Sequence, residues 1–152
     1  MVMDKTEKRI IVSSLVLMGL FVFSLLYAKN KYKSDVPECL PYDKAYEEPK
    51  VIKLDEKTYQ VFAVAQMWQF QPAEIYIPVG SEVDFYLTSK DVVHGFNIAE
   101  KNVNMMAIYG NLNKTTVKFD KPGVYDIVCH EYCGVGHQNM RAQVIVNYPE
   151  AK

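Results

Sequence analysis

The residues with the clearest chemical potential lie close together near the C-terminal end of the sequence. Over twelve positions the chain carries two thiols, an imidazole and a thioether, spaced C-x3-C-x3-H-x2-M, at Cys129, Cys133, His137 and Met140. Sulfur and imidazole donors together favour copper over the hard cations. Another imidazole, His94, lies 35 positions before Cys129. We therefore predict a copper site built from this stretch and His94.

Three simpler interpretations of this stretch compete with copper. A disulfide between Cys129 and Cys133 is compatible with their spacing, but it leaves His137 and Met140 without a role. Zinc takes Cys and His ligands, yet a thioether is not among its usual ligands. Buried Cys and Met are often plain core residues. Four such donors within twelve residues, with two glycines that let the loop fold tightly, favour a metal site instead.

The second thiol sets this stretch apart from a mononuclear blue-copper site, which needs one Cys, two His and a weak axial ligand. Two thiolates can each bridge two metal ions, and each copper then needs one His and one weak ligand. His94, His137, Met140 and a backbone carbonyl of the loop, best that of Glu131, complete this set. No coordination position is left open, so the site suits electron transfer rather than substrate chemistry.

An uncharged segment near the N-terminus is the first of the elements that must position the site. Residues 10–28 contain no charged side chain. As a helix they span roughly 28 Å, close to the ~30 Å hydrocarbon core of a bilayer. The run is longer than the apolar part of a signal peptide, and Leu26-Tyr27-Ala28 is a poor cleavage site. We predict a retained transmembrane anchor at 10–28 after a short N-terminal segment at 1–9. The flanking positive charges are balanced and do not set its orientation.

The remainder of the chain changes character near residue 58. Residues 29–58 are polar and interrupted by prolines, which predicts a linker that sets the height of the domain above the membrane. From 59 to 152, short runs rich in Val, Ile, Tyr and Phe alternate with turn signals. The predicted strands are 59–65, 74–78, 82–88, 95–98, 115–119, 123–129 and 141–147.

This strand pattern predicts the fold class and places the metal-binding residues on it. Many short strands without a capped helical pattern between them indicate an all-β, antiparallel Greek-key sandwich. His94 then lies in the loop just after one strand, and the cysteine stretch fills the loop between the last two strands. Loops at one end of a sandwich lie together, so residues remote in sequence can share a metal.

Charge and cysteine count narrow the function classes further. The formal net charge is −1 and no run of Lys or Arg forms a basic stripe, so no nucleic-acid partner is expected. Three cysteines is an odd number, and Cys39, which stands alone in the linker, is interpreted as a spare thiol rather than an intermolecular bond. No C-x-x-C-H haem motif is present, so no haem attached through such a motif is expected on this chain.

Several stretches resemble subunit II of haem-copper cytochrome c oxidases, which holds a binuclear copper centre called CuA. The resemblance covers residues from about 60 to 147, and rests on Ile77–Gly80, Ser89–Phe96 and all of Cys129–Met140. A single N-terminal helix and the run Tyr132–Met140 are similar to the B-family oxidases of thermophilic prokaryotes. The resemblance implies a cupredoxin-like β-sandwich with one transmembrane helix.

The resemblance also implies a complete ligand set for two coppers. The two cysteines bridge both coppers, the first histidine and the methionine complete one, and the second histidine and a backbone carbonyl complete the other. In this chain those positions are Cys129 and Cys133, His94 and Met140, and His137 and Glu131. In many members the acidic side chain at the position of Glu131 also reaches a magnesium ion at the interface with subunit I. The single-helix members resemble Gln there, which leaves magnesium open.

The function implied by the resemblance is uptake of electrons by a terminal oxidase. The domain would take electrons from cytochrome c outside the cytoplasm and pass them to haem in subunit I, where O2 is reduced to water. This places the chain in a prokaryotic inner membrane, with a short cytoplasmic N-terminus at 1–9 and the C-terminal domain on the periplasmic side. Trp68, the only tryptophan, resembles the aromatic residue that receives the electron, and with Met67 it can form a docking patch. His130 fills no ligand position and is interpreted as a solvated or interface side chain.

Two alternative functions stay open at this point. A CuA domain can serve a nitric oxide or nitrous oxide reductase-type complex, and nothing in these residues separates such a partner from an oxygen reductase. A membrane-tethered copper-delivery protein can also use C-x3-C with a distant His. Such proteins carry the cysteines after an early strand of a thioredoxin-like fold, without His and Met shortly after them, so the sequence disfavours this alternative.

Overall fold

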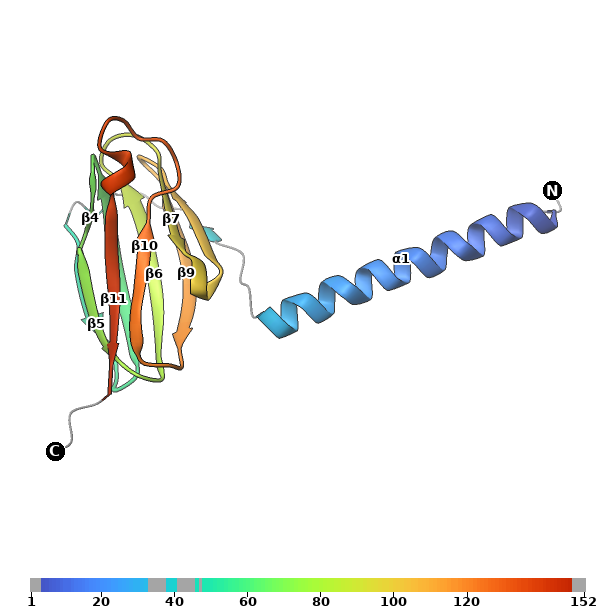
Figure 1. Cartoon of the computed structure of the whole chain (residues 1–152), viewed down its shortest axis with the longest axis horizontal. Helices are drawn as coiled ribbons and strands as arrows, with labels where there is room; N and C mark the ends of the chain where they lie inside the picture. Colours follow the sequence, from blue (N-terminus) through green and yellow to red (C-terminus); the bar gives the residue numbers. More distant parts are fainter. Residues whose placement is uncertain (1–3, 33–37, 41–45, 47, 149–152) are drawn as a thin grey trace. The chain divides into compact units, whose positions relative to one another are not determined.

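The computed structural model describes residues 4–32, 38–40, 46 and 48–148, and its chain divides into two compact units, Met1–Ser34 and Asp35–Lys152. The first unit is helix α1, Lys5–Tyr32 (Figure 1). Its apolar side chains are exposed within the chain, and by length and composition the helix can cross a membrane. The helix is longer than the predicted 10–28 at both ends, because polar residues that favour helices flank the apolar segment.

The start of α1 has a local cause in a capping box. The carboxylate of Asp4 accepts hydrogen bonds from the backbone amides of Thr6 and Glu7, and the carboxylate of Glu7 accepts one from the amide of Asp4. These reciprocal bonds satisfy backbone N–H groups that have no partner within the first helical turn. The helix therefore begins several residues before the apolar run that predicted it.

The second unit is a sandwich of two β-sheets (Figure 1). The six-stranded sheet has the order β1-β9-β6-β3-β2, with β4 also paired to β3, and the five-stranded sheet has the order β5-β11-β10-β7-β8. The strands of the first sheet are β1 Glu38–Leu40, β2 Lys50–Lys53, β3 Thr58–Gln66, β4 Gln69–Gln71, β6 Ser81–Ser89 and β9 Leu112–Phe119. Those of the second are β5 Glu74–Pro78, β7 His94–Ile98, β8 Val103–Ala107, β10 Gly123–Val128 and β11 Arg141–Asn147.

The predicted all-β Greek-key sandwich with one N-terminal helix is confirmed, with two differences. The pairs β3–β6 and β5–β11 are parallel, because the chain leaves one sheet for the other between the paired strands. Four short strands were not predicted: β1, β2, β4 and β8. Of these, β1 pairs with β9 and β2 with β3, so part of the segment predicted as a linker belongs to the first sheet.

Alternation of side chains along the strands builds the core between the two sheets. In β6, Val83, Phe85 and Leu87 are fully buried, whereas Asp84 and Tyr86 between them are partly exposed. The ring of Phe85 meets that of Phe96 from the opposite sheet at a centroid distance of 5.6 Å. Burial of this kind is the main favourable term in folding, and close packing makes the scaffold rigid. The ends of the strands, and the loops they carry, are therefore held in fixed positions.

Candidate metal centre

The loop that carries the two cysteines is a twelve-residue connection between β10 and β11 (Figure 1). Val128 pairs with Arg141 at the ends of the two strands, and the amide of Cys129 donates to the carbonyl of Met140 at 3.2 Å. The short 3-10 turn η2, His137–Asn139, is closed by the amide of Met140, which donates to the carbonyl of His137. The hairpin thus brings the first and last predicted donors of the loop side by side.

His94 reaches this loop from a neighbouring strand. It is the first residue of β7, where it pairs with Ala107 of β8, and not a loop residue as the sequence predicted. The predicted strand 95–98 begins at Gly95, one residue later than β7 does. β7 pairs with β10 through Asn97 and Val128, which sets the start of β7 beside the base of the cysteine loop.

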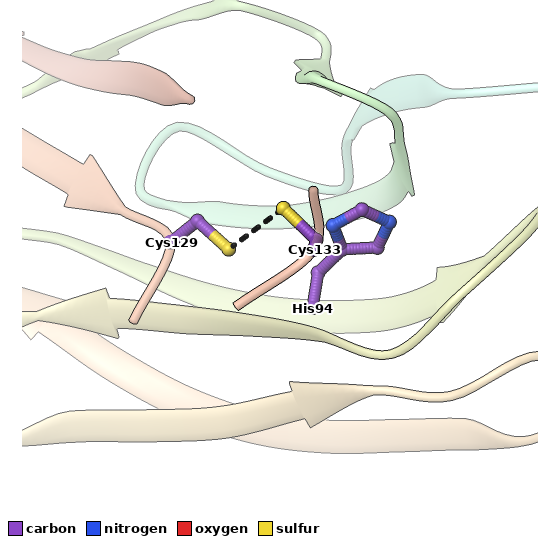
Figure 2. Close-up of side chains that lie close together, drawn as sticks. All are labelled: His94, Cys129 and Cys133. Atoms are coloured by element: carbon purple, nitrogen blue, oxygen red, sulfur yellow. Dashed lines mark hydrogen bonds between the residues drawn. The ribbon is translucent and has the colours of Figure 1, made fainter. Parts of the chain in front are cut away.

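The two thiols and His94 form one buried cluster (Figure 2). The sulfurs of Cys129 and Cys133 lie 3.8 Å apart and both cysteines are free, so the interpretation of this pair as a disulfide is wrong. One ring nitrogen of His94 and the two sulfurs all lie within 4.8 Å of one another. His94 Nε2 is hydrogen-bonded to Asp91 at 2.7 Å, whereas its buried Nδ1 has no hydrogen-bond partner among the described residues. Nδ1 is therefore the nitrogen left for a metal.

The remaining predicted donors gather around the same sulfurs. Cys133 Sγ lies 3.6 Å from His137 Nδ1 and 3.7 Å from Met140 Sδ. The thiol of Cys129 donates to the carbonyl oxygen of Glu131 at 3.3 Å. Two thiols with a thioether, a carbonyl and two imidazoles gathered around them are a donor set that fits copper. The orphaned Nδ1 of the buried His94 fits the same purpose, since a buried polar atom without a partner is costly unless it binds something.

Burial and neighbouring groups shape the proton affinities within the cluster. Burial raises the pKa of Cys133 to about 11, and the thiol of Cys129 beside it adds to the shift. Partial burial also pushes the pKa of Asp91 upward, but hydrogen bonds from His94 and from the amides of Met67 and Val92 outweigh it, so the pKa lies below its ordinary value. Asp91 is thus an anion next to His94, and Cys133 keeps its proton at neutral pH while no metal is bound.

Comparison with known proteins identifies the family. A sequence profile described as Cytochrome C oxidase subunit II, periplasmic domain, matches residues 46–147. The chain belongs to the cytochrome c oxidase subunit II family. Cytochrome c oxidase subunit 2 of Thermus thermophilus is 38% identical over 96 residues, which are 63% of this chain and 71% of that protein. Heme-copper oxidase subunit 2 of Aeropyrum pernix is 43% identical over 72 residues, 46% of this chain and 31% of that protein.

Solved structures extend the family assignment to the fold. A subunit of a heme-copper terminal oxidase dimer, solved by cryo-electron microscopy, matches with a TM-score of 0.81 and 44% identity. That match covers 94% of this chain and 100% of the other. The periplasmic domain of subunit II of cytochrome oxidase from Bradyrhizobium japonicum matches with a TM-score of 0.55 and 25% identity, over 59% of this chain and 83% of that one. The sandwich of this subunit II chain is cupredoxin-like, as predicted, and one apolar helix with a domain of a periplasmic family is consistent with single-pass topology.

Trp68 lies over the cysteine loop of the subunit II chain and is not a core residue. Its indole Nε1–H donates to the carbonyl of Cys133 at 3.1 Å, and 43% of the residue surface is exposed. The ring rests on the loop at Gly134 and Gly136, where a methyl group at Gly136 would lie 2.5 Å from Trp68 Cδ2. Glycine is therefore required at position 136 by this close approach.

His130 and a group of exposed apolar side chains surround the site. The ring of His130 packs against the backbone of Gly95, and its Nε2 lies 4.0 Å from the Glu131 carboxylate. The exposed apolar residues of the β3–β4, β6–β7 and β10–β11 loops are here called the apolar rim: Met67, Trp68, Val92, Val93, Tyr132 and Val135. An exposed apolar group of this kind marks an interaction surface.

Sequence reasoning missed one residue of the site, Asp91. Its carboxylate holds His94, and its loop is in turn fixed by the hydroxyl of Ser89, which donates to the carbonyl of Val92. The signal was present in the sequence as an acidic residue three positions before a predicted ligand. Histidine ligands usually donate their second N–H to a carboxylate or carbonyl, so a search for such a partner would have found it.

Proposed function

We propose that this chain is the electron-accepting subunit of a haem-copper terminal oxidase. In the proposal the chain takes electrons from cytochrome c through a binuclear CuA centre and passes them to haem in subunit I, where O2 is reduced to water. Family membership supports the oxidase assignment, because the relatives are named as oxidase subunits II and the closely matching structure is described as part of a heme-copper terminal oxidase. The donor and the route of the electron are the parts that go beyond this.

One observation carries the proposal: two sulfurs that are not bonded to each other have four further donor groups gathered around them. These six groups come from two separate parts of the chain. The ligands proposed are the two thiols, two imidazole nitrogens, the thioether and one carbonyl, from Cys129, Cys133, His94, His137, Met140 and Glu131. A pair of coppers held by these residues would supply a one-electron redox couple. The donor set is complete within the chain, which supports a relay rather than a substrate site.

The chain holds the proposed metal ligands rigidly and keeps water away from them, and both properties favour electron transfer. Cys129, Cys133, His94 and Met140 are buried, so little water reaches the donors. The loop base is fixed by the β10–β11 ladder, and His94 is fixed within β7. A stiff, dry site changes little in geometry between oxidation states, which is the requirement for fast electron transfer. The protein's task here is to hold the ligands still.

The apolar rim and Trp68 are the proposed contact for the electron donor. Trp68 belongs to the rim and also donates a hydrogen bond to the carbonyl of Cys133, so it joins the exposed surface directly to a proposed ligand. Met67 and Val135 beside it are exposed apolar side chains. A partner that docks on this surface would bring its redox group next to the indole. We assign this role to cytochrome c.

Membrane anchorage and magnesium are further parts of the proposal. Helix α1 is proposed to cross a prokaryotic inner membrane, with the sandwich on the periplasmic side, where cytochrome c is available. Subunit I would lie in the same bilayer. The carboxylate of Glu131 is half-exposed, as a contribution to a magnesium ion at the subunit interface requires. Metal analysis of the purified complex, with Glu131→Gln as the comparison, tests this last point.

The position of the cysteines disfavours the copper-delivery alternative. Copper-delivery proteins carry the two cysteines after an early strand of a thioredoxin-like fold, whereas in this chain they lie between the last two strands of a β-sandwich. A reductase-type partner in place of an oxygen reductase is tested by identifying the haem-bearing subunit that co-purifies with the chain.

The decisive experiment is copper analysis and spin-resonance spectroscopy of the full chain in detergent. We expect two coppers per chain, a purple colour and a delocalised mixed-valence signal. We also expect slow copper release to a competing Cu(I) acceptor, whereas a delivery protein would release it readily. One copper per chain, or the blue spectrum of a mononuclear site, would contradict the proposal.

A further inference from the structure

Besides a local hydrogen bond from the amide of Val92 at 2.7 Å, the carboxylate of Asp91 makes two strong contacts that lead to different parts of the chain. Its Oδ1 is bonded to Nε2 of the buried His94 at 2.7 Å. Its Oδ2 accepts a hydrogen bond from the backbone amide of Met67, also at 2.7 Å. Met67 lies in the turn between β3 and β4, far from His94 in sequence, and Trp68 is the next residue. One side chain thus connects a proposed metal ligand to the turn that carries the indole.

The loop around Asp91 is built to hold this carboxylate in place. The amide of Asp91 donates to the hydroxyl of Ser89 at 3.2 Å, and that hydroxyl donates to the carbonyl of Val92 at 2.6 Å. The amide of Lys90 donates to the carbonyl of Ala65 at 3.0 Å, which ties the loop to β3 just before the turn. The carboxylate is therefore a fixed point between His94 and the β3–β4 turn.

From Met67 the connection continues across the top of the site. Trp68 donates its indole N–H to the carbonyl of Cys133, and its ring rests on Gly136. The sequence of contacts His94, Asp91, Met67, Trp68 and Cys133 runs from the strand side of the cluster to its loop side. It joins His94, which lies beside the two thiols, to the backbone of Cys133.

We propose that Asp91 is a positioning residue that couples His94 to Trp68. It keeps Nδ1 of His94 turned toward the thiols, and it keeps the β3–β4 turn in place so that the indole closes over the cysteine loop. Copper retention and the position of the Trp68 indole over the cysteine loop then depend on the same carboxylate. The copper half of this inference rests on the proposed function, whereas the Trp68 half concerns the metal-free chain.

The chemistry of the contact requires a carboxylate and not merely a polar group. An ionised Asp accepts hydrogen bonds at both oxygens, so His94 must present Nε2–H to it and keep the lone pair of Nδ1 free. An Asn at position 91 has one acceptor and one donor arm. If the Asn oxygen accepts the hydrogen bond from the amide of Met67, its NH2 group faces His94. That group favours the His94 tautomer with the proton on Nδ1, and a protonated Nδ1 cannot bind a metal. If the Asn oxygen instead accepts the hydrogen bond from His94, the amide of Met67 loses its partner.

The test compares Asp91→Asn with Asp84→Asn in the full chain in detergent. Asp84 is a matched control, since it is a partly buried carboxylate on β6 with two partners, Thr116 Oγ1 at 2.6 Å and Lys114 Nζ at 3.3 Å. Loss of a carboxylate behind a histidine ligand typically weakens metal binding by about 10–100-fold. We expect a loss of this size in competition with a Cu(I)-specific chelator, with an altered mixed-valence spectrum, for the Asp91 variant only.

The fluorescence of Trp68, the only tryptophan in the chain, provides the second readout. In the metal-free Asp91→Asn chain we expect red-shifted emission and stronger quenching by acrylamide, with no change in Asp84→Asn. Ser89→Ala, which weakens the support of Asp91 and leaves its carboxylate, should shift both readouts in the same direction by less. It replaces the Asn variant if that variant fails to fold.

Each outcome decides one part of the inference. Unchanged Trp68 emission with weakened copper binding overturns the coupling, because Asp91 would then act on His94 alone. Unchanged copper retention and spectrum overturn the positioning role. A wild-type chain that binds no copper pair contradicts the proposed function instead, and the fluorescence comparison still decides whether Asp91 holds Trp68.

Discussion

The backbone amide of Cys129 donates to the carbonyl of Met140 at 3.2 Å, so the first and last donors of the cysteine loop meet at its base. Because this contact involves only backbone atoms, a change of either side chain leaves it intact. The β10–β11 ladder below it, from Val128 and Arg141 onward, fixes its position. The donors can therefore be exchanged one at a time without dismantling the loop that presents them.

Replacement of Met140 with Leu should preserve the fold and alter the redox chemistry. Met140 is fully buried with Sδ 3.7 Å from Cys133 Sγ, and Leu has a similar volume. Swaps that conserve volume usually cost less than about 1.5 kcal/mol, so the Tm of the metal-free chain should fall only slightly. Two coppers should still bind, but the reduction potential should rise, because a donor to the oxidised metal is lost. An unchanged potential in a redox titration would remove Met140 from the ligand set.

Replacement of either bridging cysteine with Ser should abolish the mixed-valence signal. A hydroxyl does not replace a thiolate as a bridge between two coppers, so Cys129→Ser and Cys133→Ser should each bind less copper and lose the purple colour. Cys39→Ser is the matched control, since it also removes one thiol but lies on β1, outside the cysteine loop. Copper per chain and the spin-resonance spectrum are the measurements. A mixed-valence signal that survives in Cys133→Ser would contradict the bridging assignment.

The fold class and the cysteine loop could be predicted from the sequence, because both depend on patterns within short stretches of the chain. The strands that carry the loop, β10 and β11, follow one another in sequence, and β11 alternates clearly between buried and less buried residues. Ala142, Val144 and Val146 of β11 are buried, and Gln143 and Ile145 between them are less so. The donors that lie on this hairpin could therefore be predicted together from their spacing.

What the sequence did not reveal depends on contacts between remote segments. The parallel pairing of β3 with β6 has no local signature, because the chain visits the other sheet between them. The same is true of Asp91, whose bond to the amide of Met67 bridges 24 positions. Gly136 was read as a residue that allows a tight loop, whereas its main constraint is the ring of Trp68 above it. Each of these exists only once the sandwich is assembled.

Oxidation of the metal-free chain should close an intramolecular disulfide between Cys129 and Cys133. Their sulfurs lie 3.8 Å apart, so a small movement brings them to bonding distance. The attacking species is a thiolate, and the pKa of Cys133 is raised to about 11. As the pH rises toward that value, more Cys133 is present as thiolate, so more of the disulfide should form by attack from Cys133. Thiol counting and mass spectrometry of a Cys39→Ser chain treated with diamide measure this. Cross-linked dimers as the main product would contradict the prediction.

Gly136→Ala should destabilise the metal-free chain through its contact with Trp68. The backbone of Gly136 has φ −92°, which any residue adopts, so the cost comes from the added methyl group, which would lie 2.5 Å from Trp68 Cδ2. Overpacking of this kind typically costs about 1–3 kcal/mol. In a Trp68→Ala background the indole is absent and the same substitution should cost much less, which a double-mutant cycle of unfolding free energies measures. In the wild-type background the displaced indole should also lose its bond to Cys133 and emit at longer wavelength. Equal costs in the two backgrounds would show that the indole does not rest on the loop.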